Sequence, residues 1–151
     1  MHVIFLDFDG VLVTRHSWLV HSAEQARADP DCVRHLNRIT TATQASIVVS
    51  STWRHGKTLK GIQEILESWE VAGNVVGMTP VLRRTEGRFS FSATRGQEIH
   101  AWLEAHAETK KFVILDDDSD IAPYMHRLVK TDIETGLTEA HVPRAIEMLL
   151  F

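Results

Sequence analysis

The chain has 151 residues, of which 44% are hydrophobic and 24% are charged. This length and balance predict one globular domain spanning 1–151 and argue against an intrinsically disordered chain. The net charge of −4 argues against a general nucleic-acid-binding protein, although the segments 54–60 and 83–88 are locally basic.

Cysteine content and hydropathy bear on the cellular compartment. Because Cys32 is the single cysteine, an internal disulfide is excluded, and we expect the protein in the reducing cytoplasm. The apolar run at 3–6 is too short for a signal peptide, and no run is long enough to cross a membrane. We therefore expect no membrane partner.

Apolar runs and helical patterns alternate along the chain. Apolar runs without polar alternation are typical of strands that are covered on both faces, and apolar residues on one stripe are typical of helices. In chain order we predict a strand at 3–6, a helix at 30–43, a strand at 46–50, a helix at 59–69, loops or short strands at 73–94, a helix at 95–106, strands at 111–115 and 128–131, and a helix at about 139–150.

This alternation predicts an α/β fold, a three-layer α/β/α sandwich around a mainly parallel, Rossmann-like sheet. In such folds ligands bind beyond the carboxyl ends of the strands, at the point where the strand order reverses. The residues that follow each predicted strand are therefore the candidates for a functional site.

Acidic and hydroxyl residues follow three of the predicted strands. Asp7 and Asp9 follow the first strand, Ser50 ends the second, and Asp116 and Asp117 follow the strand at 111–115. Carboxylates this close together repel one another unless a cation lies between them. Clustered hard oxygen ligands select Mg²⁺, which also accepts phosphate oxygens, so we expect a magnesium site.

The spacing of Asp7 and Asp9 suits two catalytic roles. Residues i and i+2 project to the same side of an extended chain, so both carboxylates can face one substrate. Gly10 permits a sharp turn directly after them. One carboxylate can act as nucleophile while the other carries a proton.

Taken one at a time, these motifs also allow other interpretations. Taken alone, "DFDG" also fits a turn that ends a strand, because Asp-Gly is a frequent turn signal. The acids of "DDDSD" are spaced as in a calcium loop, but Ile121 stands where that loop needs glycine and Arg127 where it needs glutamate. The HExxH and CxxC patterns of common zinc sites do not occur.

The combined motifs resemble those of the haloacid dehalogenase (HAD) superfamily of phosphohydrolases. The matching patterns are hhhhDxDGV at 3–11, a hydrophobic strand ending in serine at 47–50, and hhhhDD at 112–117. More narrowly, the chain is similar to the small HAD domains of nucleic-acid repair proteins in the segments "FLDFDGVL", "SSTWR", "RGQEIHAWL" and "VILDDDSD". These domains resemble polynucleotide phosphatases in the type of reaction.

The resemblance implies a role for each motif residue. Asp7 would be the nucleophile that forms an aspartyl-phosphate, and Asp9 would protonate the leaving oxygen and later activate water. Mg²⁺ would be held by the Asp7 carboxylate, the Asp9 main-chain carbonyl and Asp117, with Asp116 as a further ligand or orienting group. Ser50 would donate a hydrogen bond to a phosphoryl oxygen.

The basic residue of the superfamily pattern is usually a lysine, and here its identity is open. Arg95 is the favoured candidate, because it opens the helix before the strand at 111–115 and an arginine can hold two phosphate oxygens. Lys110 and Lys111 are the alternatives, although both directly precede a strand.

Some further residues are expected to contact the substrate, and others have two possible roles. We expect Gly10 and Ser51 beside the substrate. Arg54 could reach the substrate or pair with a surface acid, and Trp53 could be a core residue or a platform for a base. Because cap domains set substrate choice in this superfamily and the insertions here are short, we expect a capless or minimally capped enzyme with an open site.

These expectations favour a Mg²⁺-dependent phosphomonoesterase. The preferred substrate would be the terminal phosphate of a nucleotide or polynucleotide, with repair proteins as possible partners. The nearest alternative is a phosphatase of sugars or other small metabolites. A receiver-like module that keeps a phospho-aspartate is disfavoured, because such modules place the phosphorylated aspartate at the middle motif, where this chain has Ser50.

Overall fold

A five-stranded parallel sheet forms the centre of the computed structural model, which describes residues 1–20 and 27–151 apart from the Arg84 side chain. Its strand order is β3-β2-β1-β6-β7, and every adjacent pair is parallel. The strands are β1 (His2–Leu6), β2 (Ser46–Val49), β3 (Val75–Met78), β6 (Lys111–Asp116) and β7 (Leu128–Lys130). The predicted α/β fold is therefore confirmed.

The central strand β1 is buried on both faces, which explains its unbroken apolar sequence. Ile4 and Leu6 belong to the core on one face of the sheet, whereas Val3 and Phe5 belong to the core on the other. All four side chains are fully buried. This double coverage is what distinguishes a parallel strand from a half-exposed antiparallel one.

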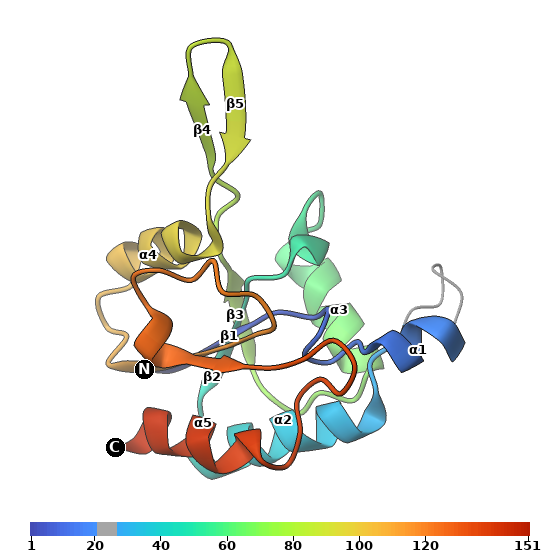
Figure 1. The fold of residues 1–151 in the computed structure, drawn as a ribbon. Coiled ribbons are helices and arrows are strands. Elements are labelled where there is room, and N and C mark those ends of the chain that lie inside the picture. The colour runs from blue at the N-terminus through green and yellow to red at the C-terminus, as the bar shows by residue number, and fades with distance from the viewer. Residues whose placement is uncertain (21–26) are drawn as a thin grey trace.

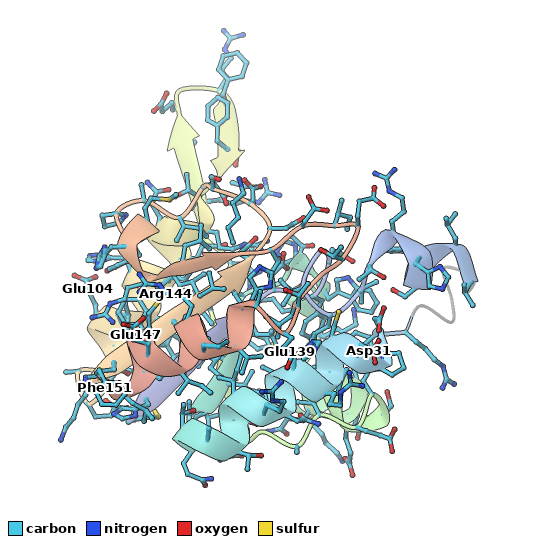
Figure 2. All side chains as sticks on the ribbon, turned by 60° about the horizontal axis from the view of Figure 1, so that its bottom comes forward. Asp31, Glu104, Glu139, Arg144, Glu147 and Phe151 are labelled. Atoms are coloured by element: carbon cyan, nitrogen blue, oxygen red, sulfur yellow. The ribbon has the colours of Figure 1, made fainter. Side chains whose placement is uncertain are left out.

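Helices cover both faces of the sheet and form the two outer layers. The helices are α1 (Arg15–Val20), α2 (Pro30–Thr43), α3 (Leu59–Ser68), α4 (Arg95–Ala105) and α5 (His141–Leu150). Residues of α2, α3 and α5 pack on the face that includes Ile4, and α4 packs on the face that includes Phe5 (Figure 1). Figure 2, which brings the first face forward, shows α5 and α2 side by side, and the two helices contact each other.

Local signals explain where these helices begin. Pro30 starts α2 after Asp29, whose side chain accepts a hydrogen bond from the Asp31 amide. At α4, Thr94 and Gln97 form a reciprocal capping box, so that Arg95 is the first helical residue. This cap sets the position of Arg95 at the edge of the sheet.

The structure differs from the predicted elements in several places. Helix α1 was missed, because its six residues are too few to show an apolar stripe. The predicted helices at 59–69, 95–106 and 139–150 are shorter in the structure, which leaves Trp69 and His106 as C-caps. The segment 73–94 supplies β3 to the main sheet and a separate hairpin.

That hairpin is formed by β4 (Arg83–Glu86) and β5 (Phe89–Ser92), which pair antiparallel. It projects away from the rest of the chain and shares no strand with the main sheet (Figure 1). This small element is the whole of the described insertion between β3 and α4, as expected for a minimally capped molecule. Among the described helices, none combines the length and apolar content that a membrane span requires.

Candidate active site

Strand register brings Asp7, Ser50 and Asp116 to one edge of the sheet. Leu6 pairs with Val49 on one side and with Leu115 on the other. The ladder continues one step further, since the Asp7 amide donates to the Leu115 carbonyl at 3.0 Å and the Ser50 amide to that of Leu6 at 3.0 Å. The chain leaves β1 toward β2 and later returns to its other side as β6, so this edge is also the switch point of the fold.

Asp7 is a buried carboxylate with a defined environment. One oxygen, Oδ1, accepts a hydrogen bond from the Phe8 amide at 2.9 Å, and the other lies 3.0 Å from Nη1 of Arg95. Burial, together with the nearby negative charge of Asp116, raises the pKa of Asp7 to about 7. The site therefore favours a further cation beside Asp7 when this carboxylate is ionised.

Asp116 and Asp117 complete an acidic group with Asp7. Carboxylate oxygens of the three residues lie within 4.8 Å of one another. Asp116 is fully buried, and its oxygens accept hydrogen bonds from Arg95 Nη1 at 2.6 Å and from the Asp118 amide at 2.9 Å. Asp117 is half-buried, and burial together with the charge of Asp116 raises its pKa.

Gly10 makes room for this acidic group. Its φ of +79° lies in the left-handed region, and a Cβ at this position would collide with the carboxylate of Asp117. Its carbonyl oxygen accepts a hydrogen bond from the Thr131 hydroxyl at 2.6 Å. Gly10 thus sits beside the acidic group expected to hold the metal.

The acidic group fits a hard divalent cation. Of the three clustered carboxylates, those of Asp7 and Asp116 share Arg95. Among the described contacts the cluster therefore retains excess negative charge, and carboxylate oxygens are the ligands that Mg²⁺ prefers. The Asp9 side chain is not a member of this cluster in the described part of the chain. The expected contribution of Asp9 to the metal site, through its main-chain carbonyl, stays a prediction.

The Asp9 carboxylate points instead to Trp53. The indole Nε1 donates to Asp9 Oδ2 at 3.0 Å, whereas Oδ1 is buried and has no hydrogen-bond partner among the described residues. Trp53 packs edge-to-face against Phe8 and Trp69, with ring centroids 5.7 and 5.5 Å apart. Trp53 is therefore a partly buried residue that packs against the core, and it also orients the expected proton carrier.

Two neighbouring serines have different surroundings. Ser50 is fully buried, and its Oγ has no partner within the described residues, although buried hydroxyls are normally paired. Ser51 Oγ accepts the Trp53 amide at 3.2 Å and thereby caps the 3₁₀ helix η2 (Thr52–Arg54). Of these two serines, Ser50 therefore keeps an unpartnered hydroxyl, while Ser51 caps the loop.

The surroundings of Arg54 differ from both expectations. Arg54 is 3% exposed and forms a buried ion pair with Glu98 at 2.9 Å, so it neither pairs with a surface acid nor opens toward a substrate. Its guanidinium also donates to four main-chain carbonyls, those of Ser50, Ser51, Thr79 and Pro80. We correct its role from substrate binding to support of the loop that carries Ser50.

Arg95 occupies the place expected for the basic residue. Both contacts to Asp7 and Asp116 are made by Nη1, which leaves Nε and Nη2 as the nitrogens that could meet a phosphoryl oxygen. Burial alone would lower the pKa of Arg95, but the two carboxylates outweigh it and raise the pKa above its ordinary value. Arg95 is therefore a permanent cation at the site.

The lysine alternatives lie elsewhere. Lys111 begins β6, at the opposite end of the strand from Asp116, and its Nζ donates to the Leu150 carbonyl at 3.0 Å. Lys110 immediately precedes it, and its amide donates to the Met1 carbonyl at 2.9 Å. The geometry thus selects Arg95 over both lysines.

The loop after β6 holds Arg95 in place. The Asp120 carboxylate accepts the Arg95 amide at 3.3 Å, and its main-chain carbonyl accepts the Gly96 amide at 3.0 Å. A Cβ at Gly96 would collide with the Ala122 carbonyl, so this close contact needs glycine.

Sequence reasoning missed several supporting residues. Glu98 gave no signal, because an acid on a helix is usually solvated. Thr79 directly follows β3, where the same strand-end rule could have found it, and its buried Oγ1 has no partner within the described chain. The link from Trp53 to Asp9 was also missed, because the order of residues in a loop does not reveal where an indole N–H points.

Comparison with known proteins agrees with this geometry. The family model described as a HAD domain in Swiss Army Knife RNA repair proteins matches residues 3–142. The match covers most of the chain, which therefore belongs to this family, and this membership supports a HAD-type phosphatase. The searches of curated proteins and of solved structures returned no match.

Proposed function

We propose that this protein is a Mg²⁺-dependent phosphomonoesterase that forms an aspartyl-phosphate on Asp7. Its preferred substrate is the terminal phosphate of a nucleotide or polynucleotide. The observation that carries this proposal is a buried carboxylate, Asp7, which belongs to an acidic group and contacts Arg95, at the same sheet edge as the unpartnered hydroxyl of Ser50.

The residues support a two-step reaction. In the first step an Asp7 oxygen attacks phosphorus, the ester P–O bond breaks, and Asp9 donates a proton to the leaving oxygen. In the second step Asp9 takes a proton from water, and the resulting hydroxide attacks phosphorus and breaks its bond to Asp7. This releases phosphate and restores the Asp7 carboxylate and the protonated Asp9. Trp53 holds one oxygen of Asp9, which leaves the other for the proton.

Negative charge on the phosphoryl group needs fixed positive partners. Arg95 supplies a permanent cation, and the Ser50 hydroxyl supplies a donor that is already removed from water. Mg²⁺, held by Asp7, Asp116, Asp117 and the Asp9 carbonyl, would neutralise charge between the nucleophile and the phosphate. Each of these groups stabilises the transferring phosphoryl group.

Two observations support a polynucleotide or nucleotide substrate. The family description refers to RNA repair proteins, from which we infer that this chain acts on RNA ends. The described insertions also include no large cap over the sheet edge, which leaves room for a bulky phosphate ester. Other repair proteins that act on the same ends are the proposed partners.

The test is phosphate release in the presence of Mg²⁺ from a substrate panel. The panel contains 3′- and 5′-phosphorylated oligonucleotides, mononucleotides and sugar phosphates, with Asp7→Asn as the control for site-specific activity. Release from oligonucleotide ends that disappears in Asp7→Asn supports the proposal. Preference for sugar phosphates would instead support a metabolite phosphatase, and stable phosphorylation of Asp7 without release would support a signalling module.

A further inference from the structure

Two aromatic side chains of the β4–β5 hairpin are exposed. Phe89 is 68% exposed and Phe91 is 45% exposed, and their rings stack with centroids 6.3 Å apart and planes at 29°. As residues i and i+2 of β5 they lie on the same face of the hairpin. Large aromatic side chains of this kind are usually buried or cover a partner.

The hairpin is positively charged in an acidic chain. Residues 83–92 read "RRTEGRFSFS", with three arginines and one glutamate, whereas the whole chain carries a net charge of −4. Arg83 and Arg88 are exposed, and Arg83 Nη1 lies 3.4 Å from Ser90 Oγ across the hairpin. This charge favours an anionic partner.

The remaining residues of the hairpin are small or polar, so its apolar surface is confined to the two phenylalanines. A stable interface with a protein partner or a second copy of the chain buries roughly 800 Å² on each side, which is more than two phenylalanine side chains supply. A combination of exposed aromatic rings and arginines is instead the surface that binds single-stranded nucleic acid, because bases stack on the rings and phosphates meet the cations.

The base of the hairpin is attached to the loop that carries Ser50. Arg54 donates to the carbonyls of Thr79 and Pro80 at 2.9 and 3.2 Å, and the same guanidinium holds the Ser50 carbonyl at 3.1 Å. The partner of Arg54, Glu98, accepts the Leu82 amide at 2.9 Å. One buried ion pair therefore fixes both the entrance of the hairpin and the predicted phosphate-binding hydroxyl.

The exit of the hairpin leads directly into the site. The Ala93 amide donates to the Leu82 carbonyl at 3.0 Å and closes the base, after which Thr94 caps α4 and Arg95 contacts Asp7. Because the hairpin follows β3, it leaves the sheet at the same edge as the strand ends that carry the site. Both views show it extending away from the sheet (Figures 1 and 2).

We propose that this hairpin binds the single-stranded segment of a nucleic acid next to the terminal phosphate that enters the Asp7 site. Phe89 and Phe91 stack with bases, and Arg83 and Arg88 contact backbone phosphates. This inference rests on the proposed function and narrows its substrate from nucleotides in general to phosphorylated single strands.

The test separates strand binding from chemistry. Phe89→Ala/Phe91→Ala is made in the Asp7→Asn background, and its affinity for fluorescent, terminally phosphorylated single-stranded RNA is measured by anisotropy. We expect the dissociation constant to rise at least about fivefold, since stacking on an aromatic residue contributes roughly 1–3 kcal/mol per base. Phe151→Ala removes an even more exposed ring, 91% exposed, and serves as the matched control.

A second measurement uses the same variants with Asp7 intact. Hydrolysis of p-nitrophenyl phosphate should stay within about twofold of the parent protein, because this small ester has no strand for the hairpin to bind. Arg83→Gln/Arg88→Gln should also flatten the salt dependence of RNA binding, because it removes phosphate contacts.

The outcomes distinguish the hairpin from the proposed chemistry. Unchanged RNA affinity in the phenylalanine variant, or an equal loss for the small ester, overturns the hairpin proposal while the phosphatase proposal stands. Phenylalanine-dependent RNA binding without phosphate release from any substrate retains the hairpin proposal and overturns the phosphatase. Binding to anionic lipid vesicles in place of RNA would show that the hairpin is a membrane contact and would overturn the inference.

Discussion

The indole Nε1 of Trp53 donates a hydrogen bond to Oδ2 of Asp9 at 3.0 Å, and the second oxygen of Asp9 has no partner among the described residues. The two oxygens of one carboxylate are therefore distinguished by their surroundings. The bonded oxygen fixes the orientation of the side chain, and the other is the one that would carry the proton in the proposed reaction.

Replacing Trp53 by phenylalanine tests this division of roles. Trp53→Phe keeps most of the aromatic packing and removes the donor, and a hydrogen bond to a charged group contributes about 1.5–3 kcal/mol. We expect kcat to fall roughly 10- to 100-fold, because each ~1.4 kcal/mol of lost transition-state stabilisation lowers a rate tenfold. The pH profile of kcat should also change. Trp69→Phe is the control, because Trp69 packs against Trp53 and Phe8 in the same cluster. An equal loss in both variants would indicate a packing role alone.

Arg95 is expected to be needed for catalysis, whereas Lys111 is not. Arg95→Gln removes the cation shared by Asp7 and Asp116, and we expect kcat/KM to fall at least about 100-fold, as when one fixed donor to a developing charge is lost. Lys111→Gln lies at the other end of β6 and should behave as the parent. Steady-state kinetics on phosphorylated substrates check both, and a large loss in Lys111→Gln would contradict the assignment.

The Arg54–Glu98 pair should matter for stability. Side chains of this pair are 2% and 11% exposed, so Arg54→Met leaves a buried acid without its partner. We expect the free energy of unfolding to fall by about 3–5 kcal/mol, measured by urea denaturation. Arg144→Met breaks the exposed pair with Glu147 and should cost less than about 1 kcal/mol. Equal effects would show that burial does not determine the contribution of the Arg54 pair.

Gly10 provides a test of the metal site. Gly10→Ala introduces both left-handed strain and a collision with the Asp117 carboxylate, whereas Gly56→Ala introduces comparable strain with no atom within 4 Å. We expect both variants to lose about 1 kcal/mol of stability from strain, and Gly10→Ala alone to bind Mg²⁺ weakly. Isothermal titration of Mg²⁺ measures the difference, and equal metal affinity in the two variants would argue against Asp117 as a ligand.

The metal-free protein should lose stability as the pH rises toward neutrality. The pKa of Asp7 is about 7 in the folded chain and near 3.8 when unperturbed, so the folded state holds more protons between these values. Asp7 then reduces the free energy of unfolding by up to ~1.4 kcal/mol per pH unit across this window. The side chain of the Asp7→Asn variant cannot ionise. The free energy of unfolding of this variant should therefore increase relative to that of the parent from about pH 4 to about pH 7. A constant difference in urea denaturation across this range would contradict the raised pKa.

The strand ends could be predicted from the sequence because both signals are local. Unbroken apolar runs mark strands covered on both faces, and parallel strands must end at a common edge, which places Asp7, Ser50 and Asp116 together. Arg54 could not be predicted in the same way. It lies in a locally basic segment that suggests a solvated surface, and only tertiary packing brings Glu98 to it.

The hairpin was only partly predictable. The alternation in "RFSFS" is compatible with a short strand, but alternation normally indicates that one face is buried, and here both phenylalanines are exposed. Helix α1 was missed because it is too short to show a clear periodicity, whereas β3 lies in the segment 73–94, for which loops or short strands were predicted. Short elements depend on contacts with the rest of the fold, which a local pattern does not contain.

The hairpin has a consequence for how this chain could diversify. Its ladder is independent of the main sheet, and its base is closed by Leu82 and Ala93 next to a fixed ion pair. Residues 83–92 can therefore be exchanged for a hairpin of another length or composition without altering the strand ends. The same phosphate chemistry would then be directed to a different class of ester by recombination of one surface module.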